Sequence, residues 1–218
     1  MKNKLIVIEG LDGGGKTTQL ELLKSEYADC RFITFPNYGS PSGEIVTNYL
    51  QGKYKEENNS ISAYTASCFY AVDRYTSYKT DWEKDYKAGI PIISARYVSS
   101  NAMYQMTKLP KNSWDEYMDW LFDTEYNKFG IPKPDGTIFL DMPVEVSQKL
   151  LMKRYGGDKA KMDLHESNLE FMNNCREAAF YVAEKENWRI ISCAENNEPL
   201  PIDFIHGKLK KEIEELLK

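Results

Sequence analysis

The fold of this chain is decided by the stretch LIVIEGLDGGGKTT, residues 5–18. Its first four residues are branched and apolar, which is typical of a buried strand. Residues 10–17 match the pattern G-x-x-x-x-G-K-[ST], in which glycines let backbone N–H groups turn inward around a phosphate at the start of a helix. The motif therefore predicts a nucleoside triphosphate site, held by Gly10, Gly13, Gly14, Gly15, Lys16, Thr17 and Thr18.

Two side chains of this loop have specific expected tasks. Lys16 is expected to reach the outer phosphates, and the hydroxyl of Thr17 can bind magnesium. A glycine-rich turn that merely joins a strand to a helix is the alternative. The apolar run before the motif and the helical spacing after it, at Leu20 and Leu23, favour the phosphate site.

Four further runs of branched apolar residues have the length of buried strands. Segments with helical spacing of apolar residues separate them. Strands that alternate with helices predict an α/β fold with a five-stranded parallel sheet and helices on both faces. With no linker or repeat in the sequence, we expect one domain over residues 1–218. The predicted strands are residues 5–8, 31–35, 90–94, 137–141 and 188–192.

Composition excludes several classes of protein. The 218 residues include 28 Lys and Arg against 33 Asp and Glu, a formal net charge of −5, so the broad basic field that nucleic-acid binding requires is missing. No apolar run approaches the ~20 residues that span a bilayer. The four cysteines form no C-x-x-C pair, which indicates free thiols and no structural zinc. We therefore expect a cytoplasmic protein with neither nucleic acid nor membrane as partner.

Further motifs follow the phosphate loop in a particular order. They are Phe35-Pro36, FYAVDR at 69–74, ARYVSSNAMYQ at 95–105, Pro134-Asp135, Leu140-Asp141 and DLHE at 163–166. Together with the loop, this series resembles the thymidylate kinases, which phosphorylate thymidine monophosphate, over roughly residues 4–217. The resemblance implies a P-loop NTPase fold, ATP as phosphoryl donor, Mg²⁺ as cofactor, thymidine monophosphate as acceptor, and a homodimer.

Two pairs of residues in these motifs have helical spacing and suit an acceptor nucleotide. Tyr70 and Arg74 are four apart, so on a helix they share a face where a ring can stack on a base and a guanidinium can donate to a base carbonyl. The resemblance implies those roles for them. It also implies that Asn101 helps to recognise the base and that Tyr104 packs where a ribose 2′-hydroxyl would project. Singly, each residue also suits ordinary packing or capping.

The resemblance assigns the remaining acceptor contacts as well. Asp12 accepts a hydrogen bond from the substrate's 3′-hydroxyl and helps to hold magnesium. Arg96 grips the acceptor phosphate, because an arginine fork lowers the repulsion between two phosphates and fixes their direction. Phe35 and Pro36 are expected beside the substrate. Lys16 and Arg96 are thus expected to act in catalysis.

The main departure from the family pattern follows the third strand. Thymidylate kinases usually carry Asp-Arg after the third strand, whereas this chain has Ala95-Arg96. The missing carboxylate would sit near the magnesium. Its absence could weaken metal binding, slow the transfer, or pass the task to Asp12, Glu9 or Glu166. The metal ligands predicted from the sequence are Thr17, Asp12 and Glu166.

A polar segment at residues 153–164 is expected to form a short lid. The phosphate loop has no arginine, so the resemblance implies that a lid cation reaches the transferring phosphoryl group. The candidates are Lys153, Arg154, Lys159 and Lys161, of which we favour Arg154. A solvated loop is the alternative interpretation of these charges.

Two other functions remain open on the sequence. One is a kinase for another deoxynucleotide or for a deoxynucleoside. The other is a catalytically weakened nucleotide-binding protein, which Ala95 would explain.

Overall fold

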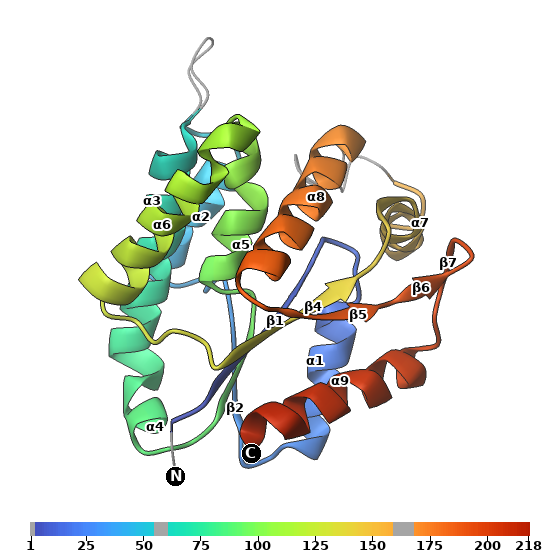
Figure 1. Ribbon diagram of the computed structural model, residues 1–218, viewed down its shortest axis with the longest axis horizontal. Helices are drawn as coiled ribbons and strands as arrows, with labels where there is room; N and C mark the ends of the chain where they lie inside the picture. The colour runs from blue at the N-terminus through green and yellow to red at the C-terminus, as the bar shows by residue number, and fades with distance from the viewer. Residues whose placement is uncertain (1–2, 55–60, 159–167) are drawn as a thin grey trace.

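The computed structural model describes residues 3–54, 61–158 and 168–218 as an α/β structure with one five-stranded sheet (Figure 1). The strands are β1 (Leu5–Gly10), β2 (Arg31–Thr34), β3 (Ile92–Ala95), β4 (Gly136–Asp141) and β5 (Arg189–Ser192). The α-helices are α1 (Lys16–Glu26), α2 (Pro41–Leu50), α3 (Ala63–Ser77), α4 (Glu83–Lys87), α5 (Val98–Tyr104), α6 (Trp114–Phe122), α7 (Val144–Arg154), α8 (Leu169–Lys185) and α9 (Ile202–Leu217). The short segments are η1 (Tyr78–Trp82) and η4 (Asp123–Lys128), which are π-helical, η2 (Met106–Lys108) and η3 (Lys111–Ser113), which are 3₁₀ turns, and the two-residue strands β6 (Ala194–Glu195) and β7 (Glu198–Pro199).

The sheet is entirely parallel, with the strand order β2-β3-β1-β4-β5. The central strand β1 pairs with β3 on one side, where Val7 lies opposite Ser94, and with β4 on the other, where Val7 lies opposite Thr137. The carboxyl ends of all five strands therefore lie at one edge. After β1 the chain runs to one face of the sheet and after β3 to the other, which opens a crevice where ligands bind in such sheets.

Alternation along β1 divides the core into two layers. Leu5 and Val7 pack in a cluster with side chains of α3, α5, α6 and α8, whereas Ile6 and Ile8 pack with side chains of α1 and α9. This is the period of two expected for a strand that is buried on both faces. Figure 1 shows the result, with α1 and α9 on one side of the sheet and α3, α5, α6 and α8 on the other.

The five predicted strands and the parallel sheet are confirmed, with ends shifted by one or two residues. The short ribbon of β6 and β7 was not predicted, since two-residue strands have no readable apolar period. Asn196 and Asn197 join these strands with positive φ angles of 51° and 60°. Asparagine tolerates this left-handed region, as hairpin turns require. The Asn-Asn pair was thus the available signal.

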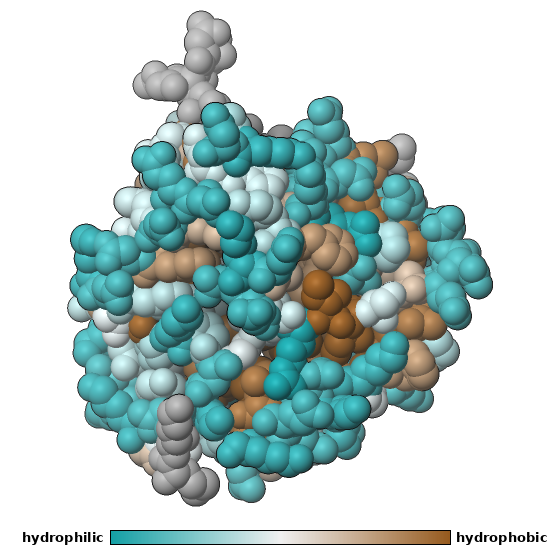
Figure 2. Space-filling model, in the orientation of Figure 1, coloured by the Kyte–Doolittle hydropathy of each residue, from teal (hydrophilic) through white to brown (hydrophobic). Residues whose placement is uncertain are grey.

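The surface seen in Figure 2 is mostly hydrophilic over α8 and α9. Apolar surface gathers between these helices, where β5 crosses the view, and Ile190 of β5 is 45% exposed. Among the described residues, no helix is long and apolar enough to cross a bilayer.

Candidate active site

The phosphate loop connects β1 to α1 at the carboxyl edge of the sheet. Gly13 and Gly15 have φ angles of 74° and 85°, a region that side-chain-bearing residues rarely adopt. A Cβ atom on Gly13 would also lie 2.7 Å from Leu151 and 2.8 Å from the carbonyl oxygen of Ser147. Gly15 is the N-cap of α1, so the loop ends where the positive end of a helix dipole begins. This geometry suits an anion cradle.

Lys16 is the first residue of α1 and folds back over the loop. Its Nζ donates to the carbonyl oxygens of Gly10 and Leu11 at 2.7 and 2.8 Å. Burial is the main cause that lowers the pKa of Lys16 to about 7, and the nearby Arg96 lowers it further, while Asp12 and Glu9 act in the opposite direction. A phosphate group that approached this ammonium would favour its charged form.

A donor-side cavity lies in front of the loop. Arg154, the last residue of α7, and Ala95, the last residue of β3, both line it. Gly10 and Thr18 do not line it; Gly10 acts through its carbonyl oxygen, and Thr18 is exposed. The residues of the loop that line this cavity are Asp12, Gly13, Gly14, Gly15, Lys16 and Thr17.

A second, acceptor-side cavity lies beside the first. It is lined by all eight residues that the sequence predicted for the acceptor, namely Asp12, Phe35, Pro36, Tyr70, Arg74, Arg96, Asn101 and Tyr104. They come from the phosphate loop, the turn after β2, α3, the turn after β3, and α5. Burial raises the pKa of the Tyr70 hydroxyl, which therefore stays neutral.

Five residues line both cavities, and Arg96 and Asp12 are the charged ones among them. Arg96 has a φ of 65°, and its backbone N–H donates to the carbonyl of Ile8 at 3.0 Å. A bulky residue with a positive φ angle has a strained backbone, which persists only where the surrounding structure stabilises it. Such strain is common at functional sites. The five residues are Asp12, Phe35, Pro36, Tyr38 and Arg96.

Asp12 is held by two partners at this junction. Nη2 of Arg96 donates to one carboxylate oxygen, and the hydroxyl of Tyr104 donates to the other at 3.0 Å. The guanidinium of Arg96 also lies over the Tyr104 ring, 5.1 Å from its centroid. Burial by itself would lower the pKa of Arg96, but the neighbouring Asp12 raises it well above its ordinary value. The guanidinium of Arg96 therefore keeps its positive charge beside the Asp12 carboxylate.

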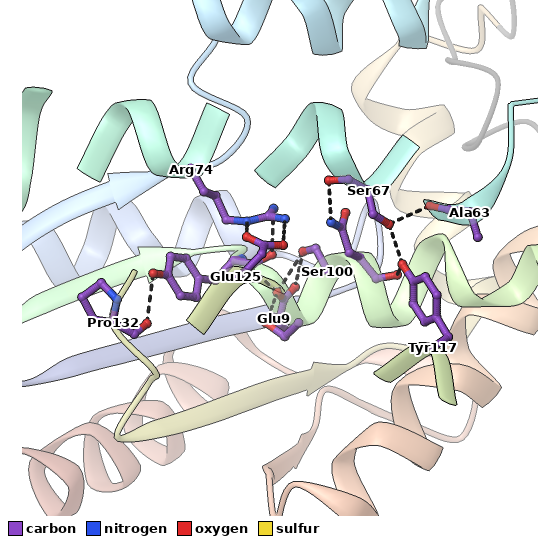
Figure 3. A network of polar contacts seen from close by, with 11 residues as sticks. Glu9, Ala63, Ser67, Arg74, Ser100, Tyr117, Glu125 and Pro132 are labelled. Carbon is purple, nitrogen blue, oxygen red and sulfur yellow. Dashed lines mark hydrogen bonds and ion pairs between the residues drawn. The ribbon is translucent and has the colours of Figure 1, made fainter. Parts of the chain in front are cut away.

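The far end of the acceptor cavity has a buried polar network (Figure 3). Arg74 forms a bidentate ion pair with Glu125 of η4, with both N–O distances 2.6 Å. Nδ2 of Asn101 donates to the carbonyl oxygen of Ser67 at 3.2 Å. Such a network fixes its members because each broken contact would leave a buried polar group without a partner.

Glu9 does not take the place of the missing carboxylate, contrary to one of the options from the sequence. It is fully buried and accepts hydrogen bonds from the backbone N–H of Tyr97 and from the hydroxyls of Ser99 and Ser100 (Figure 3). Its oxygens therefore hold the start of α5. The short strand-to-helix connection brings this helix end over β1, which the sequence pattern alone did not reveal.

The predicted metal ligands are only partly described. Asp12 and Thr17 both line the donor-side cavity, whereas Glu166 lies outside the described residues. Within the described ranges, no three His, Cys, Asp or Glu side chains converge as a metal cluster. One carboxylate and one hydroxyl suit Mg²⁺, which usually keeps several waters and takes its other ligands from phosphates.

The predicted lid is also described only in part. Lys153 and Arg154 end α7, and Gly156 and Gly157 follow with φ angles of 62° and 85°. Lys159 and Lys161 lie outside the described residues. Of the two described cations, Arg154 lines the donor-side cavity.

The sequence analysis missed two residues of the site. Tyr38 lies two residues after Phe35-Pro36 and lines both cavities. Its closeness to that motif in the sequence could have indicated a place in the site. Glu125 lies in a run of mixed polar residues that reads as a solvated face, so no local pattern could single it out.

Comparison with known proteins agrees with this geometry. The family model for thymidylate kinase matches residues 8–200. A probable thymidylate kinase of Pyrobaculum aerophilum is 27% identical over 199 residues, which cover 91% of this chain and 92% of the relative. The thymidylate kinase of Mycobacterium tuberculosis is 30% identical over 148 residues, 66% of this chain and 68% of the relative.

A solved structure supports the fold. The thymidylate kinase of Candida albicans superposes with a TM-score of 0.72 at 23% identity, covering 100% of this chain and 94% of that chain. At 23% sequence identity, the similarity between the two structures shows a shared fold and nothing further. The family model matches most of the chain, and this match shows that the protein is a member of the thymidylate kinase family.

Proposed function

We propose that this kinase transfers the γ-phosphoryl group of ATP to thymidine monophosphate and produces thymidine diphosphate. The observation that carries the proposal is the meeting of two cavities at Asp12 and Arg96, with a phosphate loop on one side and a pocket of base-binding character on the other. A phosphoryl group has to cross only this junction. Membership in the thymidylate kinase family supports the choice of acceptor.

Phosphoryl transfer demands positioning and charge more than covalent chemistry. The N–H groups of the loop and Lys16 would hold the outer phosphates of ATP, and the Arg96 guanidinium would hold the acceptor phosphate. Arg96 touches the junction from the turn after β3, so it can lower the repulsion between the two phosphates as they approach. Arg154 at the end of α7 is the cation proposed to reach the transferring group from the lid side.

The acceptor pocket supports recognition of a deoxypyrimidine nucleotide. Tyr70 would stack on the base, and Arg74 and Asn101 would bond to its edge. Tyr104 and Asp12 are bonded to each other at 3.0 Å, so together they would confine the sugar, with Asp12 receiving the 3′-hydroxyl. Phe35 and Pro36 line both cavities, so they would lie beside the acceptor phosphate.

Magnesium belongs to the proposal as the cofactor that neutralises charge on the phosphates of ATP. Thr17 and Asp12 are the described residues that would hold it, and Glu166 is proposed as a further ligand. Ala95 lines the same cavity, so an aspartate there would face the phosphates. The protein is therefore expected to depend more strongly on free Mg²⁺ than relatives that carry that carboxylate.

A panel of acceptors tests the proposed function. ADP release from ATP and Mg²⁺ is measured with the monophosphates of thymidine, deoxyuridine, deoxyguanosine and uridine, and without acceptor. Release that is fastest with thymidine monophosphate supports the proposal. If ATP binds while every acceptor fails, the proposal is wrong and a nucleotide-binding role would replace it.

We also propose that the protein is a homodimer. Helix α3 exposes Val72 and Tyr75, each 40% accessible, and Cys68 on the same side. Such an apolar helix face suits burial against a second copy. Light scattering on the purified chain tests this: a mass of about twice the 25.2 kDa of the monomer supports it, and the monomer mass at micromolar concentration contradicts it.

A further inference from the structure

A single buried carboxylate lies behind the two side chains proposed to contact the base. Arg74 and Glu125 are 1% and 0% exposed, and Figure 3 shows Glu125 reaching from η4 toward the guanidinium. Nε and Nη2 of Arg74 donate to different oxygens of Glu125 at 2.6 Å, and Nη1 donates to the carbonyl oxygen of Tyr97 at 3.3 Å. The guanidinium is therefore fixed in plane and direction.

The remaining hydrogen-bonding capacity of Arg74 can be counted. A guanidinium has five N–H donors, and the contacts to Glu125 and Tyr97 use three of them. One N–H on Nη1 and one on Nη2 remain. Because Arg74 lines the acceptor-side cavity, it presents donors there and no acceptor.

Asn101 lies near the same carboxylate. Its Nδ2 donates to the carbonyl oxygen of Ser67 at 3.2 Å. The same amide lies close enough to Glu125 to lower the pKa of that carboxyl, against the larger, opposing effect of burial. A carbonyl oxygen and a carboxylate only accept. The NH₂ group of Asn101 therefore has to face both of them, and Oδ1 is left for a ligand.

The Ser67 side of this arrangement is itself fixed. The Ser67 hydroxyl donates to the carbonyl oxygen of Ala63 at 2.7 Å and lies 2.5 Å from the hydroxyl of Tyr117 (Figure 3). Tyr117 is fully buried. The carbonyl that receives Asn101 cannot readily turn away, so the direction of the amide is determined by α3 and η4 together.

We propose that Glu125 is a positioning residue that sets the order of donor and acceptor in this pocket, so that the pocket selects bases with a keto oxygen beside a ring N–H. The inference rests on the proposed function. Donors on Arg74 match O4 of thymine or uracil, and Oδ1 of Asn101 matches N3–H. Guanine has the same pair in O6 and N1–H, but it differs from thymine in its larger ring system and in the 2-amino group that replaces the O2 acceptor.

Amino bases have the opposite order. Cytosine carries an NH₂ group beside an unprotonated N3, so it would set donor against donor at Arg74 and acceptor against acceptor at Asn101. A glutamine in place of Glu125 would bring an NH₂ group to the Arg74–Asn101 side. The amide of Asn101 would then lose the contact that fixes it, and its NH₂ group could turn toward the ligand.

The experiment compares kcat/KM for the monophosphates of thymidine and deoxycytidine in the wild type, Glu125→Gln and Glu125→Asp. The control is Glu212→Gln, which breaks a half-buried ion pair with Arg189 between α9 and β5. We expect the wild type to prefer thymidine monophosphate by about 100-fold or more, as for a well-formed two-bond contact. Glu125→Gln should reduce this ratio about tenfold or more, whereas Glu125→Asp and the control should keep it.

The outcomes distinguish a failure of the proposed role of Glu125 from a failure of the proposed function. A wild type that uses both monophosphates equally, or a Glu125→Gln enzyme with the wild-type ratio, overturns the role of Glu125 and leaves the proposed function standing. A wild type that does not phosphorylate thymidine monophosphate overturns the proposed function itself. KM for ATP and the thermal midpoint report whether a variant is merely less stable, which would lower both kcat/KM values without changing their ratio.

A measurement on the unaltered protein complements the variants. In the absence of nucleotide, the side-chain N–H groups of Asn101 should exchange with solvent at least about tenfold more slowly than those of Asn174, which is exposed on α8. ¹⁵N-resolved NMR measures both. Equal exchange rates would show that the amide is not held, and would contradict the proposal even if Glu125→Gln fails to fold.

Discussion

Arg96, in the turn after β3, forms an ion pair with Asp12 in the loop after β1, at the place where the donor-side and acceptor-side cavities meet. The two side chains are 19% and 23% exposed, so a phosphate can approach them while the surrounding protein limits solvent screening. The strained backbone of Arg96 aims the side chain across the sheet edge. The relative position of β1 and β3 thus fixes the position of Arg96 relative to Asp12, and with it the proposed distance between the two substrates.

Removal of the Arg96 guanidinium should act mainly on the acceptor. For Arg96→Ala we expect a fall in kcat/KM for thymidine monophosphate of about 10²-fold or more, because a preorganised charge contact to the phosphate is lost. The affinity for ATP should change much less. Steady-state kinetics and ATP titration check this. The control is Arg31→Ala, which removes an arginine paired with Asp81 and Asp85 away from both cavities; equal losses in the two variants would contradict the role of Arg96.

The lowered pKa of Lys16 predicts proton uptake on ATP binding. In the free protein this pKa is about 7, and triphosphate oxygens beside the ammonium raise it. Well below pH 7 the group is charged in both states, so there it adds no pH dependence. At pH 8 it is mostly neutral before binding and charged after, so close to one proton is taken up and affinity falls as pH rises. Calorimetry in two buffers of different ionisation enthalpy measures the uptake; the same uptake in Lys16→Met would contradict the assignment.

Restoration of the family carboxylate at position 95 should lower the Mg²⁺ concentration that the enzyme requires. Ala95 lines the cavity that contains Thr17, so Ala95→Asp should lower the Mg²⁺ concentration for half-maximal turnover or raise turnover itself. Ala95→Asn has nearly the same shape without the charge and is the control. A magnesium titration identical in Ala95→Asp and the wild type would count against a missing-ligand account.

The buried Glu9 should matter for stability through its hydrogen bonds. In Glu9→Ala, the backbone N–H of Tyr97 would lose its partner, together with the hydroxyls of Ser99 and Ser100. We expect the free energy of unfolding to fall by about 1–3 kcal/mol or more, as for a buried donor left unsatisfied. Urea denaturation measures this. Glu9→Gln keeps one acceptor oxygen and should lose less; an equal loss in both variants would show that the charge, not hydrogen bonding, is the important property.

The sheet and the phosphate loop could be predicted because their signals are local. Strand β1 has four consecutive branched apolar residues, and the loop has every fixed position of its motif within residues 10–17. The partner of Arg74 could not be predicted, since Glu125 is 51 residues away in sequence and lies in a polar run on a π-helical segment. Glu125 is buried only because distant segments of the chain pack around it, and no local pattern in the sequence shows this. Glu9 illustrates the same limit, because its role depends on where α5 begins in space.

The central claim, transfer from ATP to thymidine monophosphate, is tested most directly by following the phosphate itself. ATP labelled in the γ-position is incubated with Mg²⁺ and thymidine monophosphate, and the labelled products are separated. The label should appear in thymidine diphosphate, in equal amount to the ADP formed, and Lys16→Ala should slow its appearance by about 10²-fold or more. Label found only in inorganic phosphate, or no transfer by a wild type that binds ATP, would contradict the account.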